Sequence, residues 1–113
     1  MQKQYDVYLN DILRSIDKAL RYTSGLEYPE FSGNDIVIDA VIRNLEIIGE
    51  AVKNLPPDFR KKHGEIEWIK IAGLRDILIH EYSGVDKRIV WDIVKNKLPE
   101  LKKAIKRITQ QEN

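Results

Sequence analysis

The densest group of chemically active side chains lies in the segment RDILIHEY at residues 75–82. It holds Arg75, Asp76, His80, Glu81 and Tyr82. Histidine changes protonation near neutral pH, so it can take a proton from a ribose 2′-hydroxyl or return one to a leaving oxygen. Arginine presents a planar fork of donors to the charge that builds on phosphorus, and tyrosine can bind a phosphate oxygen or stack on a base. These residue types suit phosphodiester chemistry. Proton transfer by histidine and charge stabilisation by arginine would require no metal.

Helical spacing limits how these side chains can cooperate. Asp76 and His80 are four residues apart and share one face, so we expect Asp76 to orient the His80 ring. Arg75 and Tyr82 are seven apart and share another face, about 140° around the helix from His80. A straight helix in one chain would therefore not bring Arg75, His80 and Tyr82 to one substrate atom. Either the helix unwinds near His80, or a second copy completes the site across a two-fold axis.

The same residues have structural interpretations. A histidine near a helix C-terminus interacts favourably with the helix dipole, and an Arg–Asp pair on a helix surface is often simply solvated. A second polar group, Arg43, Glu46 and Glu50, is spaced i, i+3 and i+7 in an apolar segment. It is interpreted as an ion-pair network in or near an interface. The functional alternative is that Arg43 and Glu50 position the Arg75/His80 site without contacting the substrate.

Apolar residues at helical spacing predict four main helices and no strand. The first begins near Tyr5 and stops at Ser24-Gly25. The second runs over 36–55 and is apolar on more than one side, which is typical of a helix in the middle of a bundle or in a subunit interface. Its predicted start is a capping box of Ser32 and Asp35, with Phe31 and Ile36 as a hydrophobic staple, and Pro56-Pro57 ends it.

A basic loop at 60–64 is predicted to precede the third helix, which runs from about Glu65 to Tyr82. The fourth helix has Asp86 as N-cap and Val85 with Val90 as a staple. Pro99 removes a backbone donor, so a kink or break is expected there. The polar tail from Thr109 is expected to be disordered. The prediction is an all-α, antiparallel four-helix bundle that forms a single domain over residues 1–113.

Composition excludes several classes of protein. The chain has 113 residues and no cysteine, which excludes disulfides, a thiolate zinc site and a cysteine nucleophile. His63 and His80 lack the spacing of a zinc site, so neither metal nor cofactor is expected. No apolar run reaches membrane-spanning length and no signal peptide is seen, so we expect a cytoplasmic protein without a membrane partner. Residues 57–113 carry 13 basic and 9 acidic side chains, a modest excess that would allow an anionic partner.

The spacing Arg75-x-x-x-x-His80-x-Tyr82, with Asp76 after the arginine, resembles the R-x-x-x-x-H-x-Y motif of HEPN-domain ribonucleases. Three further blocks are similar to the HepT branch of that family: AVIRNLEIIGEA at 40–51, Trp68 with GLRD at 73–76, and WDI at 91–93. HepT proteins are toxins of toxin–antitoxin modules, paired with an MNT-type minimal nucleotidyltransferase antitoxin. Their helical bundles form homodimers in which both subunits line one cleft.

The resemblance implies a metal-independent endoribonuclease that acts on RNA. His80 would be the general base or acid, Arg75 would stabilise the transition state, and Tyr82 would be the tyrosine that the antitoxin AMPylates. The added AMP would block the cleft by its bulk and negative charge. Two alternatives from the residues remain. One is a non-catalytic helical dimer that binds a nucleotidyltransferase or a nucleotide, and the other is a hydrolase of a small nucleotide.

Overall fold

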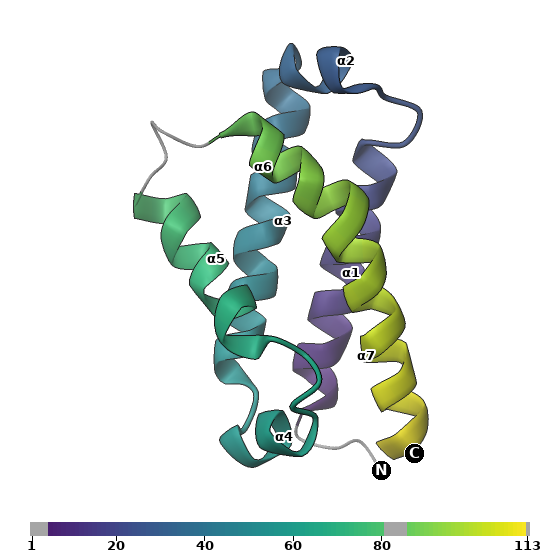
Figure 1. Ribbon diagram of the computed structural model, residues 1–113, viewed down its shortest axis with the longest axis vertical. Helices are drawn as coiled ribbons and strands as arrows, with labels where there is room; N and C mark the ends of the chain where they lie inside the picture. The colour runs from purple at the N-terminus through teal and green to yellow at the C-terminus, as the bar shows by residue number, and fades with distance from the viewer. Residues whose placement is uncertain (1–4, 81–85, 113) are drawn as a thin grey trace.

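Long helices packed side by side make up the protein, and a computed structural model describes residues 5–80 and 86–112, with the backbone alone at 75–80. The elements are α1 (Asp6–Tyr22), α2 (Tyr28–Ser32), α3 (Asp35–Asn54), α4 (Pro57–Lys62), α5 (Trp68–His80), α6 (Lys87–Asp92), the π-helical η2 (Ile93–Lys97) and α7 (Leu98–Glu112). The chain passes up α1, down α3, up α5 and down α6–η2–α7 (Figure 1). The described residues contain no strand, which confirms the all-α prediction.

The core lies between α1, α3 and α7, with α3 at the centre. α3 packs against α1 on one side and α5 on the other, as expected for a helix that is apolar on more than one side. The side chains with almost no exposed surface come from all three of these helices: Ile12, Ile16, Val41, Leu45, Ile48, Val52, Ile105 and Ile108. Among the helices that the structure describes, none is long and apolar enough to cross a membrane.

The start of α3 differs from the prediction. Asn34, not Ser32, is the N-cap, and its side-chain oxygen accepts a hydrogen bond from the Val37 N–H at 3.1 Å. Ser32 ends the short helix α2, whose own capping box is formed by Glu27 and Glu30. The predicted staple is also wrong, because Phe31 is fully buried while Ile36 is 83% exposed. The sequence pattern does not reveal α2, so the predicted N-cap of α3 was placed two residues too early.

The predicted basic loop is partly helical, because α4 occupies Pro57–Lys62. Proline at the first helical position needs no hydrogen-bond partner for its nitrogen, so Pro57 starts α4 as well as preventing α3 from continuing. α5 then begins at Trp68 rather than near Glu65. The buried indole Nε1 of Trp68 donates to the carbonyls of Arg60 at 3.1 Å and His63 at 3.0 Å. These bonds fix the turn between α4 and α5.

The fourth predicted helix is continuous but irregular. Asp86 is its N-cap, as predicted, and its carboxylate accepts from the Arg88 N–H at 2.8 Å. The other part of that prediction, Val85 in a staple, lies outside the described residues. The helix does not break at Pro99. Instead the π-helical segment η2 lies directly before it, consistent with a wider turn that accommodates the missing donor.

The expected disordered tail is also wrong, because α7 continues through Thr109 to Glu112. The contacts of one carboxylate explain why the C-terminal residues are helical. Oε2 of Glu112 lies 2.8 Å from Nζ of Lys62 and 2.8 Å from Nε2 of His63, and Oε1 accepts from the Tyr5 hydroxyl at 3.0 Å. The C-terminal turn is thus tied to α4 and to the start of α1. These partners are distant in sequence, so local polarity did not predict the contact.

Candidate active site

The last two turns of α5 carry the residues of the predicted site. Arg75, Asp76 and His80 lie on α5 (Trp68–His80), whereas Glu81 and Tyr82 lie outside the described residues. The α5 backbone is α-helical through His80, so no unwinding occurs up to that residue. Positions 75 and 80 are therefore still about 140° apart around one helix axis.

The first half of α5 is held firmly in the bundle. Trp68 is 5% exposed and Ile66, just before the helix, is 7% exposed. Ile71, Ala72 and Leu74 are partly buried and pack against the core, mainly beside α3. Burial and the two indole hydrogen bonds of Trp68 thus orient the helix that carries Arg75 and His80 about two and three turns later.

One side of α5 is left exposed although its sequence is apolar. Ile69 is 85% exposed, and a Cβ added at Gly73, one turn further on, would meet no atom within 4 Å. The sequence of the helix, WIKIAGLRDILIH, places apolar residues on all sides, a pattern that normally belongs to a buried helix. Part of α5 therefore lacks a covering partner within the described residues of one chain.

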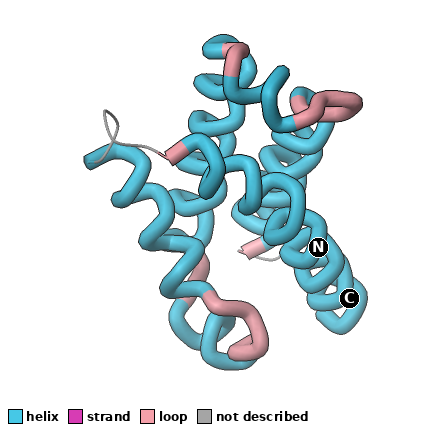
Figure 2. The backbone as a smooth tube through the Cα atoms, turned by 45° about the horizontal axis from the view of Figure 1, so that its top comes forward, coloured by secondary structure: helices cyan, strands magenta, loops and turns pink. Residues whose placement is uncertain are grey.

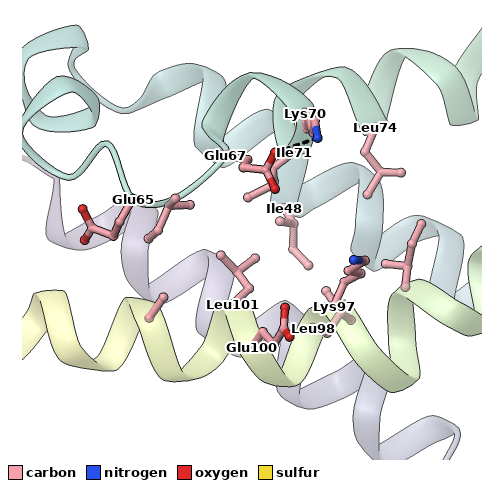
Figure 3. A pocket seen from close by; sticks show the side chains of 13 residues that line it. Ile48, Glu65, Glu67, Lys70, Ile71, Leu74, Lys97, Leu98, Glu100 and Leu101 are labelled. Atoms are coloured by element: carbon pink, nitrogen blue, oxygen red, sulfur yellow. Dashed lines mark ion pairs between the residues drawn. The ribbon is translucent and has the colours of Figure 1, made fainter.

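An apolar groove lies between the first half of α5 on one side and α7 and η2 on the other. Its volume is about 380 Å³, and Ile48 of α3 lies between the two walls (Figure 3). The other apolar side chains that line it are Ile66, Ile71, Leu74, Ile93, Leu98, Leu101 and Ala104. Leu74 precedes Arg75 directly, so the groove leads along α5 toward the position of the motif.

Ionisable side chains surround this groove. Nζ of Lys70 lies 2.6 Å from a carboxylate oxygen of Glu67, drawn as a dashed line in Figure 3. The hydrogen bond between them lowers the pKa of Glu67 and raises the pKa of Lys70. The lining contains three carboxylates and two lysines: Glu65, Glu67, Glu100, Lys70 and Lys97. This balance does not favour a polyanion inside the groove.

Arg43, Glu46 and Glu50 lie together, as their spacing predicted, but on the α1 side of α3. Nη1 of Arg43 is 3.6 Å from Oε2 of Glu46. With Tyr8 and Asp11 of α1, the three residues line a pocket of about 250 Å³. None of the described residues that line it comes from α5. The structure thus brings Arg43 and Glu50 to each other and to α1, and not to the groove beside α5.

The second histidine has a structural position. His63 is 4% exposed and its Nε2 contacts Glu112. The Lys62 ammonium and His63 hold the pKa of Glu112 at about 2, and the same contact raises the pKa of Lys62. Local sequence patterns do not reveal this cluster, because Glu112 lies 49 positions after His63. Within the described ranges, no three carboxylate, histidine or cysteine side chains are grouped to hold a metal ion.

An all-α antiparallel bundle with R-x-x-x-x-H on its third long helix defines a HEPN-like protein. Residues 12–108 match the family model described as "Ribonuclease HepT-like". The chain belongs to this family.

Two relatives with named functions are similar to this chain over almost their whole length. The chain is 46% identical over 105 residues to "Putative RNase TTE0752" of Caldanaerobacter subterraneus, covering 93% of this chain and 94% of that protein. It is 44% identical over 102 residues to "Probable ribonuclease HepT" of Thermococcus cleftensis, covering 90% and 93% of the two chains. No solved structure gives a significant match. Family membership and these names support a ribonuclease.

Proposed function

We propose that this chain is the toxin of a HepT/MNT-type toxin–antitoxin system. In this proposal it is a cytoplasmic, homodimeric, metal-independent endoribonuclease. The observation that carries the proposal is the placement of Arg75 and His80 on the last two turns of α5 in a chain of the HepT-like ribonuclease family. The residue types match the two needs of phosphodiester cleavage, which are proton transfer and stabilisation of charge on phosphorus.

His80 acts as the general base or acid of an internal transesterification. The ribose 2′-oxygen loses its proton and attacks the adjacent phosphorus, and the bond from phosphorus to the 5′-oxygen breaks. The leaving oxygen takes up a proton, so the products are a 2′,3′-cyclic phosphate and a 5′-hydroxyl. Arg75 donates hydrogen bonds to the charge on the phosphoryl oxygens. Asp76, four residues before His80, orients the imidazole.

A second copy of the chain completes the site. Positions 75 and 80 lie on different faces of one helix that is regular through His80. A two-fold axis would place residues of both subunits in one cleft. Two observations support this arrangement: the 85% exposure of Ile69 and the open surface at Gly73. A partner subunit would cover this apolar side of α5.

Tyr82 is the residue through which the nucleotidyltransferase antitoxin silences the toxin. The tyrosine oxygen forms a bond to the α-phosphorus of ATP, pyrophosphate leaves, and the hydroxyl proton is released. The AMP group adds bulk and negative charge two residues after His80, where RNA must approach. Both effects oppose binding of an RNA phosphate.

Cleavage of a labelled structured RNA in EDTA tests the ribonuclease activity. Unmodified wild-type protein, verified by intact mass, is expected to cleave the RNA, whereas Arg75→Ala and His80→Ala are expected to lose at least about 100-fold in rate. Lys70→Ala is the matched control on the exposed surface of the same helix and should retain activity. RNA with a 2′-deoxy nucleotide at the cleaved position should resist cleavage. Intact RNA after incubation with unmodified, dimeric wild-type protein would contradict the proposal for that RNA.

Incubation with an MNT-type nucleotidyltransferase and ATP tests the modification. The wild-type chain is expected to gain the mass of one or more AMP groups and to lose cleavage. Tyr82→Phe should gain no mass and should continue to cleave RNA in the presence of the partner and ATP. Modification of Tyr82→Phe would show that a different residue accepts AMP.

A further inference from the structure

The solvent side of α7 carries a group of positively charged side chains. Lys103, Lys106 and Arg107 are exposed and lie within an arc of about 100° around the helix. The buried residues Leu101, Ile105 and Ile108 occupy the opposite side. No acidic residue occurs between Leu101 and Gln111. We call these three cations the α7 basic face.

The α7 basic face differs from neighbouring surfaces, on which basic side chains are paired with acidic ones. Lys102 lies beside it but is paired, because its Nζ is 2.7 Å from Asp17 of α1. On the solvent side of α1, acids and bases alternate, and Asp11 pairs with Arg14 at 3.8 Å. Within the part of the chain that the structure describes, the three cations of the α7 basic face make no ion pair. Their charge is therefore available to a partner.

Helix α4 carries a second group of basic residues near the C-terminal end of α7. Its last turn is Arg60, Lys61 and Lys62, and the 2.8 Å contact between Lys62 and Glu112 holds that turn beside the end of α7. Glu112, the acid at this end, is engaged by Lys62 and His63. Lys61 is exposed. Glu112 lies about 180° around α7 from Lys103, so these α4 residues are not part of the α7 basic face.

The composition of the face indicates which partner it fits. The exposed side chains of α7 between 99 and 112 are all charged or polar: Glu100, Lys103, Lys106, Arg107, Gln110 and Gln111. Protein interfaces have cores that are depleted in charge and enriched in aromatic residues, and no exposed aromatic residue lies on this helix. Long flexible cations without apolar neighbours suit a phosphate backbone, whose binding does not depend on sequence.

We propose that the α7 basic face is a docking surface for the phosphate backbone of RNA, separate from the cleavage site. The proposal rests on the proposed ribonuclease function for the identity of the polyanion. The face lies opposite the buried side of α7, and the groove beside α5 is lined by different α7 residues, including Leu98 and Ala104. A long RNA would contact α7 while its cleaved segment lies at α5. A short RNA would occupy the cleavage site alone.

The salt dependence of RNA binding tests the proposal. Binding of a long, labelled single-stranded RNA is measured by fluorescence anisotropy in the inactive His80→Ala background, over a series of salt concentrations. Each phosphate contact on a single strand contributes about 0.7 to the slope of log affinity against log salt. The triple variant Lys103→Gln, Lys106→Gln and Arg107→Gln is expected to lower the magnitude of that slope by about 2. Binding of a short oligonucleotide should change little.

The matched control removes the same charge from another surface. Arg14→Gln, Lys18→Gln and Arg21→Gln change the net charge equally, but on α1, and should leave the slope close to that of the parent. Circular dichroism should show that both triple variants remain helical. An equal reduction of slope in both triple variants, or no reduction in the α7 variant, would overturn the docking surface.

The outcomes of the two proposals can be told apart. RNA binding that depends on the α7 cations, without cleavage by unmodified His80-containing protein, would support the docking surface and contradict the ribonuclease proposal. The α7 triple variant could instead cleave long RNA at the parental rate and with the parental salt dependence. That result would support the ribonuclease proposal and contradict the docking surface. If that variant kept its RNA binding but lost binding to polyglutamate, the face would belong to an acidic protein partner and the RNA proposal would be overturned.

Discussion

At the scale of single residues, Glu112 shows how one carboxylate can connect distant parts of the chain. It contacts Tyr5, Lys62 and His63, which come from the first residues of the described chain and from the α4–α5 connection. The connection leads into α5, which carries Arg75 and His80. The chain that leads into α5 is therefore held by an acid 32 positions after His80 in the sequence.

Glu112 makes the stability of the protein depend on pH. Its pKa is lowered from 4.5 to about 2 by hydrogen bonds from Lys62, His63 and Tyr5. The unfolded chain therefore binds more protons than the folded chain between these values, and stability falls as the pH falls through this window. We expect Glu112→Gln to lower the melting temperature at pH 7 and to show a weaker loss of stability between pH 4.5 and 2. Thermal unfolding followed by circular dichroism measures both.

Glu100→Gln is the control for this change, because Glu100 is an exposed acid on the same helix. It should leave the melting temperature and its acid dependence close to wild type. If Glu112→Gln and wild type lost stability in parallel between pH 4.5 and 2, the cluster would not be a source of the acid dependence.

At the scale of elements, the starts of the helices decide how the bundle is assembled. Asn34 caps α3 and Asp86 caps α6, each through a side-chain oxygen that accepts a backbone N–H. The start of α5 is held by the buried Trp68 ring and its two hydrogen bonds. Tertiary burial thus fixes the start of the helix that carries the motif.

The cap of α3 can be tested against the residue that the sequence pattern favoured. Asn34→Ala removes the acceptor of the Val37 N–H and is expected to lower the free energy of unfolding by about 1 kcal/mol. Ser32→Ala should lower it by less than about 0.5 kcal/mol, because Ser32 lies at the end of α2 and its exposed hydroxyl donates to the Pro29 carbonyl, not to an N–H of α3. Urea unfolding of both variants measures the difference. A larger effect from Ser32→Ala would restore the original prediction of the cap.

At the scale of the whole molecule, α5 packs mainly on α3, and its first half leaves the apolar residue Ile69 exposed. It packs on α3 but stands apart from α7 (Figure 2). A bundle in which an apolar helix lacks a partner on one side either leaves that side in water or covers it with another subunit. In the proposed homodimer, another subunit covers this side of α5. The two subunits together bring motif residues close that one α5 helix holds apart.

Ile69→Asp tests this dimer. In the proposed interface a charge would be buried at a position that is 85% exposed in one chain, so the dimer dissociation constant should rise at least about tenfold. RNA cleavage should fall with the dimer population. Val7→Asp places the same charge on α1 at a residue that is 50% exposed, and it should leave the dimer intact. Analytical ultracentrifugation measures the association, and circular dichroism shows whether the helices persist.

An unchanged dimer in the Ile69→Asp variant would place the interface elsewhere on the molecule. A wild-type protein that is monomeric at the concentrations of the cleavage assay, yet cleaves RNA, would contradict the proposal that two subunits share a site.

The sequence alone determined the helical class, the order of the four main helices, the cap at Asp86 and the family, because these depend on apolar periodicity and on short motifs. The residues proposed for catalysis were likewise visible as a motif, and their roles stay predictions. Local patterns could not show α2, the cap at Asn34 or the order of the C-terminal turn. Each depends on which residues are neighbours in space: Phe31 is buried by other elements, and Glu112 finds partners 49 to 107 positions away.

The tertiary structure alone decided which surfaces remain available. Arg43 and Glu50 have the spacing to support a site on α5, yet they line a pocket with α1, because the rotation of α3 is set by its buried face. The groove beside α5, the exposure of Ile69 and the absence of ion pairs at Lys103, Lys106 and Arg107 within the described residues also emerge only from packing. Helical periodicity is a property of neighbours along the chain, whereas burial and charge pairing are properties of neighbours across it.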